Sequence, residues 1–91
     1  IEQHREEILA TAIGTLDEPD RRIRAELALL LQAVEATLLV DDPDLVSGFT
    51  AWQSSLLSSH GYAEEMPANL QRGMSAGLAA VAPEAADLLE G

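Results

Sequence analysis

The chain has no cysteine and no lysine, and only three of its 91 residues are aromatic. Without cysteine it has no disulfide bond, no zinc–thiolate site and no thiol nucleophile. No run approaches the roughly 18 consecutive apolar residues that cross a membrane, and no signal peptide is apparent. We therefore expect a cytoplasmic protein that does not bind membranes.

Basic residues are also scarce, because five arginines stand against 16 acidic residues, for a net charge of -11. Such a surface repels phosphate groups, so we expect no nucleic acid as a partner. Hydrophobic residues make up 47% of the chain, which suits one small folded domain. Because the first residue is Ile1 rather than Met, we expect residues 1–91 to be a single domain within a longer chain.

No segment alternates apolar and polar residues over the length of a strand, whereas apolar residues recur at helical spacing throughout. Glycine and proline divide the chain into expected helices over residues 1–16, 19–40, 42–60, 63–82 and 83–89. Breaks are expected near 17–20, 41–43, 60–63 and 82–83. The sequence thus predicts an all-α fold, an antiparallel helical bundle of four main helices plus a short C-terminal helix.

The segment 19–40 is apolar around most of its circumference. A helix of this kind is central in its bundle or lies in an oligomer interface. We expect the face that carries Leu29 and Ala36 to pair with a second copy, as a homodimer, or with an adjacent domain. Because the net charge opposes self-association, a dimer should tighten as the salt concentration rises.

Three arginines, Arg21, Arg22 and Arg24, fall in the first turn of this helix, where positive charge opposes the helix dipole. Neighbouring carboxylates can compensate that charge, and they belong to Asp17, Glu18 and Asp20. The alternative is that the arginines dock an acidic surface of another domain or subunit.

Asp41, Asp42 and Asp44 place three carboxylates within four residues. Carboxylate oxygens suit hard cations such as Mg²⁺ or Ca²⁺, but the segment lacks the other oxygen ligands of a calcium loop. Helix capping is the favoured interpretation, with Asp42 as N-cap, Pro43 as first helical residue and Asp44 in the first turn. We therefore expect no metal.

Trp52 and His60 lie eight residues apart on one expected helix. They can line a pocket for a flat cofactor, with His60 as an axial ligand or proton carrier. The structural alternative places Trp52 in the apolar core and His60 at the helix end, where the dipole favours it and Gly61 closes the helix. Gly73 and Gly77, four apart, similarly predict either a close helix contact in the core or a seam for a partner.

From Ile23 to Leu89 the sequence resembles a known class of helical modules. The shared features are DDPDL at 41–45, Phe49 three residues before Trp52, Leu56-Leu57, His60-Gly61, Asn69-Leu70 and Ala82-Pro83. They resemble the helical sensor modules of bacterial signalling proteins that sit beside cobalamin-binding or anti-sigma-antagonist-type domains, and stressosome sensor modules. The resemblance implies a regulatory domain whose aromatic-bearing helix packs in the bundle or faces a neighbouring domain's ligand.

No enzyme is expected, because the chain has only two histidines besides lacking cysteine and lysine, and it shows no Gly-rich phosphate loop. We expect a non-enzymatic sensory and protein-interaction module without a cofactor, which acts through helix packing and through dimer or interdomain contacts. The alternative is a helical cap over cobalamin, or another flat ligand, held by a neighbouring domain. Trp52 separates the two, because it is buried in the first and partly exposed in the second.

Overall fold

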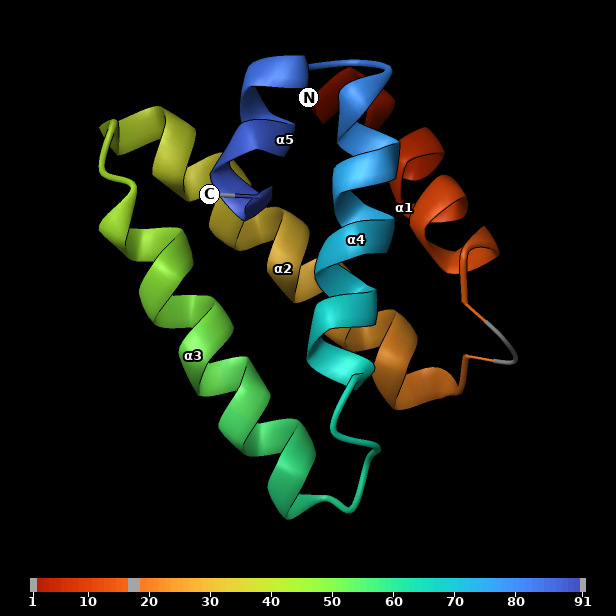
Figure 1. Cartoon of the computed structure of the whole chain (residues 1–91). Helices are drawn as coiled ribbons and strands as arrows, with labels where there is room; N and C mark the ends of the chain where they lie inside the picture. The colour runs from red at the N-terminus through yellow and green to blue at the C-terminus, as the bar shows by residue number, and fades with distance from the viewer. Residues whose placement is uncertain (1, 17–18, 91) are drawn as a thin grey trace.

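The computed structural model describes residues 2–16 and 19–90, and no β-strand occurs within them (Figure 1). A 3-10 turn, Glu2–His4, leads into five α-helices. These are α1 (Arg5–Gly14), α2 (Arg21–Val40), α3 (Asp44–Ser59), α4 (Met66–Ala79) and α5 (Pro83–Glu90). The predicted all-α class is confirmed, and in the described ranges every helix is too short or too polar to span a bilayer.

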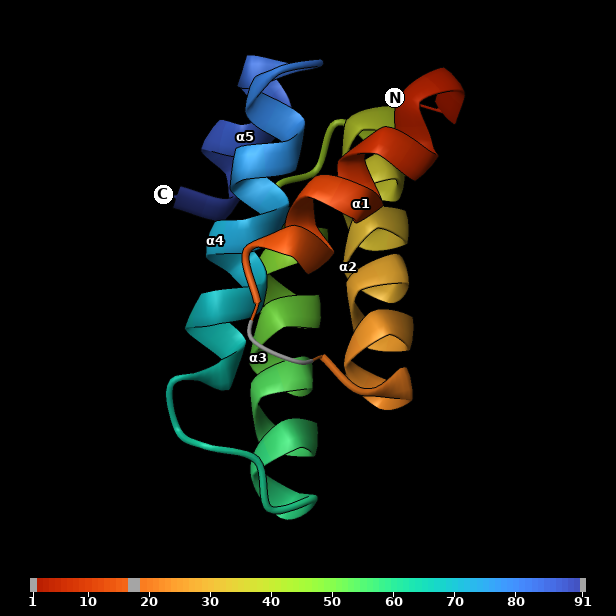
Figure 2. The ribbon, with the colours of Figure 1, turned by 90° about the vertical axis from the view of Figure 1, so that its right-hand side faces the viewer.

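Each α-helix runs roughly opposite to the one before it (Figures 1 and 2). α1 packs against α4, α4 against α5, and α2 against α3, while α2 and α4 each contact all the other α-helices. The expectation that the 19–40 helix is central is therefore met by α2, which shares this position with α4. The molecule measures 32 × 25 × 18 Å along its principal axes.

The core is a single cluster to which every α-helix contributes. Its fully covered members include Ile8, Leu27, Leu30, Leu31, Val34, Leu57, Leu70, Met74, Leu78 and Ala85. Four polar residues of the described ranges are buried with them: Glu26, Thr37, Gln53 and Ser75. Two of the four meet, because the side-chain amide of Gln53 donates both to the backbone carbonyl of Glu26 and to its carboxylate, at 3.1 Å each. The sequence analysis did not identify this pair, since isolated polar residues on a helix normally face water.

The ends of α2 follow from two aspartates. The Asp20 carboxylate caps the first turn by accepting the backbone N–H of Ile23 at 2.9 Å. Asp41 closes the other end in the left-handed conformation, with φ of 55°. This closing role was not anticipated, because glycine is the usual residue there and aspartate adopts this conformation less often.

The predicted end of α3 agrees with the structure, whereas its start lies later than predicted. The regular helix begins at Asp44, so Pro43 rather than Asp42 is the N-cap residue, and its side chain makes no capping hydrogen bond. Asp42 lies one residue earlier and accepts the backbone N–H of Asp44 at 3.1 Å. At the other end His60 follows the last helical residue, and Gly61 has φ of 82°. α4 begins at Met66 rather than Ala63, because Pro67 occupies its first turn, and it ends at Ala79 rather than Ala82.

Gly73 and Gly77 make the close contact in the core that the sequence favoured over a partner seam. A Cβ on Gly77 would lie 2.6 Å from the carbonyl oxygen of Ile8, and one on Gly73 would lie 3.0 Å from that of Ala12. Both partners belong to α1, so only glycine lets α1 and α4 approach this closely. We call this contact the α1–α4 seam.

Candidate functional site

One side of the α2–α3 pair carries apolar side chains that the described residues leave partly or largely open to solvent. We define the α2–α3 outer face as Leu29, Ala33, Ala36, Val40, Leu45, Phe49 and Trp52. Large members of the set are well exposed, with 57% of Val40 and 52% of Trp52 open to solvent. Leu29 and Ala36, which the sequence assigned to a partner contact, are both exposed. The face therefore remains available for a partner.

Helical spacing and contacts place the α2 part of this face beside α3. Leu29 and Ala36 are two turns apart, and Val40 follows one turn later, so they form one strip. Glu35 points to another side of α2, because its carboxylate forms an ion pair with Arg5 of α1. The strip is thus turned away from α1 and toward the side where α3 lies.

The α3 part of the face continues the same surface. Leu45 and Trp52 are two turns apart, and the rings of Phe49 and Trp52 lie 5.6 Å apart between centroids. The opposite flank of α3, with Ser54 and Ser58, lines a cavity against the α3–α4 connection. The outer face therefore points away from α4 and α5, which Figure 2 shows on the left with α2 on the right.

The outer face is also free of charge along α3. From Leu45 to Ser59 there is no acidic, basic or histidine residue, although 16 acidic residues occur in the chain. The absence of charged residues over this stretch can be read directly from the sequence. It could have identified α3 as part of the candidate site. A neutral, apolar helix surface suits contact with protein more than contact with ions or polar ligands.

Trp52 does not lie in the core, so the expectation that it packs inside the bundle is wrong. Val46, Gln53 and Leu57 define the inward side of α3, and Trp52 falls about 100° from Gln53 around the helix. Its indole lies beside the ring of Phe49, and about half of the side chain stays open to solvent. His60 is exposed at the helix end, and neither Trp52 nor His60 lines the cavities near Ser54 or Tyr62.

Arg21, Arg22 and Arg24 are all exposed. Within the described residues no carboxylate lies within 4.0 Å of their guanidinium groups, and the expected partners Asp17 and Glu18 lie outside those residues. The three arginines point to different sides of α2. Arg22 falls on the line of Leu29 and Val40, whereas Arg24 falls on the line of Glu35, toward α1.

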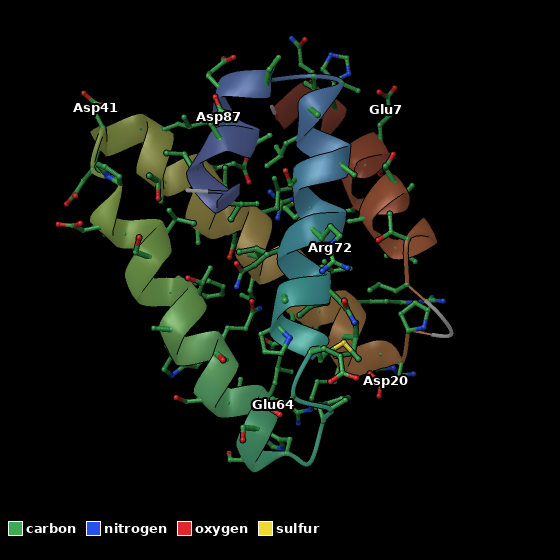
Figure 3. All side chains as sticks on the ribbon, in the orientation of Figure 1. Glu7, Asp20, Asp41, Glu64, Arg72 and Asp87 are labelled. Carbon is green, nitrogen blue, oxygen red and sulfur yellow. The ribbon has the colours of Figure 1, made fainter. Side chains whose placement is uncertain are left out.

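Asp41, Asp42 and Asp44 crowd the turn that joins α2 to α3, where two of them shape the backbone. In the part of the chain that the structure describes, no three His, Asp or Glu side chains are arranged to hold a metal ion. Asp20 and Asp41 mark the two ends of α2 in Figure 3. The hairpin formed by α2 and α3 thus has three arginines beside Asp20 at one end and three aspartates without a basic residue at the other.

A second candidate site is a cavity of about 570 Å³ beside the start of α2. Its walls are mostly apolar, and its polar side chains are Thr15, Asp20, Tyr62, Asn69 and Arg72. The Tyr62 hydroxyl donates a hydrogen bond to the Asp20 carboxylate at 2.8 Å. The sequence analysis did not identify this cavity, because its residues lie far apart in the chain.

Two shifted pKa values follow from these contacts. The backbone N–H of Ile23 and then the Tyr62 hydroxyl stabilise the charged carboxylate, so the pKa of Asp20 is lowered. The same hydrogen bond stabilises the neutral phenol, so the pKa of Tyr62 is raised above 10.0. These groups hold the α3–α4 connection against α2, and neither is arranged as an acid–base pair with a nucleophile.

No protein-family model, no curated protein sequence and no solved structure matches this chain. The outer face and the cavity are therefore interpreted from their own residues.

Proposed function

We propose that this chain is a non-enzymatic sensory and protein-interaction module of a bacterial regulatory protein in the cytoplasm. It docks through the α2–α3 outer face and responds by shifts in helix packing. In this proposal the fold works as an antiparallel bundle of four main helices closed by the short α5. The observation that carries the proposal is an exposed, uncharged apolar face on a chain of net charge -11.

The physical reason is the cost of leaving apolar groups in water. Contiguous exposed apolar surface is uncommon on monomeric proteins and marks interaction sites. Leu45 is 43% exposed and Trp52 52% exposed, two turns apart on one side of α3, so covering both would remove a large apolar area from water. Tryptophan is also among the residues that contribute most to protein interfaces.

A second candidate function is favoured by one observation, the exposure of Trp52. In this alternative the chain is a cap over cobalamin, or another flat ligand, bound by a neighbouring domain. Trp52 would then cover the ligand's face, and His60, at the end of α3, would lie about two turns along and about 80° around from it. From the sequence, the interaction module placed Trp52 in the core and the cap left it partly exposed, so its exposure matches the expectation for the cap. The interaction proposal now requires a protein partner to cover Trp52, whereas the cap requires a bound ligand to cover it.

The test measures how accessible Trp52 is to a quencher. Trp52 is the only tryptophan of the chain, so acrylamide quenching of its fluorescence reports on this face alone. We expect several-fold weaker quenching in the full-length protein, or in the concentrated chain, than in the dilute chain. A Trp52→Phe variant of the full-length protein supplies the signal to subtract.

The same substitution of alanine by glutamate serves as test on the outer face and as control elsewhere. Ala36→Glu puts a charge on the outer face and should restore full quenching, whereas Ala10→Glu, at an exposed position of α1, should not. If Trp52 is equally accessible under all conditions, the face has no partner and the proposal fails. Saturable quenching by added cobalamin, unaffected by Ala36→Glu, would support the cap instead.

A further inference from the structure

We propose that the occupant of the α2–α3 outer face is a second copy of this chain, with the two α2 helices packed antiparallel. The inference rests on the proposed function, since it names the partner of the same face. A two-fold axis across the helices would place α2 against the partner's α2 and α3 against the partner's α3. Self-association by such an axis requires one surface to be complementary to itself.

The pattern of large and small residues along α2 meets that requirement. Leu29 and Ala33 share residue 31 as their midpoint, so an antiparallel copy centred there places each leucine over the other copy's alanine. Ala25 and Ala36 have nearly the same midpoint, and both are exposed. Small residues at these positions let two helix axes approach closely, with leucines filling the space between them.

The charges at the two ends of α2 meet the same requirement. Arg21 and Asp41 also share residue 31 as their midpoint, so the antiparallel arrangement brings each arginine end against the partner's aspartate turn. An axis running along the helices would instead bring arginine to arginine and aspartate to aspartate. Charge complementarity therefore selects the antiparallel form.

The remaining surface explains why a copy would meet the chain here. Two chains of net charge -11 repel each other over most orientations, and the uncharged length of α3 offers a contact without acidic groups. α2 is about 30 Å long and α3 about 24 Å, and with their axes about 9 Å apart and a helix diameter of about 10 Å they present about 500 Å² per copy. The pair would bury about 1,000 Å², the least expected of a specific interface.

The test uses disulfide trapping, which has no background because the chain lacks cysteine. Arg22 and Val40 lie on one line of α2, eighteen residues or five turns apart. We mix R22C, carrying a mass tag, with V40C in a glutathione redox buffer and identify the disulfide-linked dimers by mass spectrometry. In the antiparallel dimer these cysteines face each other across the interface, whereas two R22C cysteines are about 27 Å apart.

We expect the mixed disulfide to exceed each same-variant disulfide at least about tenfold, against about twofold for random collision. R24C mixed with V40C is the matched control and should stay near the random ratio, because Arg24 points toward α1. Sedimentation equilibrium of the cysteine-free chain should show a dimer that A36E abolishes and A10E preserves. Circular dichroism verifies that each variant is folded.

Two results would overturn the inference. One is a random or same-variant product pattern, and the other is a chain that stays monomeric at about 1 mM and 0.15 M salt, where screening shortens the repulsion to about 8 Å. If either result occurs while Trp52 is shielded in the full-length protein, the proposed docking function stands and only the second copy is excluded.

Discussion

The α1–α4 seam and the α2–α3 outer face are built from similar residue types, yet the chain closes one and leaves the other open. In the seam, Gly77 lets the backbone of Ile8 approach, and Ile8 is almost completely buried. On the outer face, alanines surround Leu29 in the same way, but 39% of Leu29 remains exposed. The difference is that α1 fills the first groove, and no part of the described chain fills the second.

This contrast separates residues that maintain the fold from residues that are free to bind. No fully buried core residue belongs to the outer face, so a partner can cover this face without rearranging the core of the monomer. Mutations in the seam should therefore change the free energy of unfolding, and mutations on the face should change association. The following predictions test this division.

The largest effect is expected from removing a buried side chain of the seam. Ile8→Ala should lower the free energy of unfolding by about 2–5 kcal/mol, through lost burial and the cavity that remains. Leu29→Ala, the matched change on the outer face, should cost under about 1 kcal/mol in the dilute monomer. Urea denaturation at low protein concentration measures both, and equal losses would contradict the division.

A smaller effect is expected from adding one methyl group to the seam. Gly77→Ala places a Cβ 2.6 Å from the Ile8 carbonyl oxygen, and relieving that clash should cost about 1–3 kcal/mol. Part of the loss is offset by the better helix propensity of alanine, by up to about 1 kcal/mol.

Gly14→Ala is the control for this substitution, because a Cβ there has no neighbour within 4 Å. It should leave the protein as stable or slightly more stable. Thermal unfolding compares the two variants, and a Gly77→Ala protein that is more stable than the Gly14→Ala protein would show that the seam has room to spare.

The smallest effect concerns the hydrogen bond that ties the α3–α4 connection to α2. Tyr62→Phe should raise the pKa of Asp20 toward its ordinary value without reaching it, because the Ile23 N–H remains the larger cause. Asp20→Asn should lower the pKa of Tyr62 toward 10.0. Carboxyl NMR and the absorbance of the only tyrosine give the two titrations, and unchanged values would mean that this bond is absent in solution.

The signs of the linked stability changes follow from these shifts. The lowered pKa of Asp20 gives stability that is present above the unfolded value of about 3.9 and is lost as the pH falls through the folded value. The raised pKa of Tyr62 gives stability that is present below about 10 and is lost as the pH rises through the folded value. Tyr62→Phe should flatten both edges of the stability profile.

Much of the fold could be predicted from local patterns. Apolar spacing identified every helix, and Gly61 and Pro67 have the positions that capping chemistry assigns them, whereas Pro43 and not Asp42 is the N-cap of α3. The spacing of Gly73 and Gly77 correctly indicated a close contact in the core. Local patterns did not predict which side chains of α3 are buried, since Trp52 is exposed while Gln53 beside it is buried.

The sequence by itself determined the helices, their ends and the strongly acidic surface, because periodicity, capping and charge act between residues close together in the chain. Only the tertiary structure decided which apolar strip was covered. Whether Leu29 or Trp52 meets another helix depends on how α1, α4 and α5 divide the sides of α2 and α3. All the helices pack around one core, and only some side of each can be buried in it. Which side is buried depends on contacts between residues far apart in the chain, which no single segment specifies.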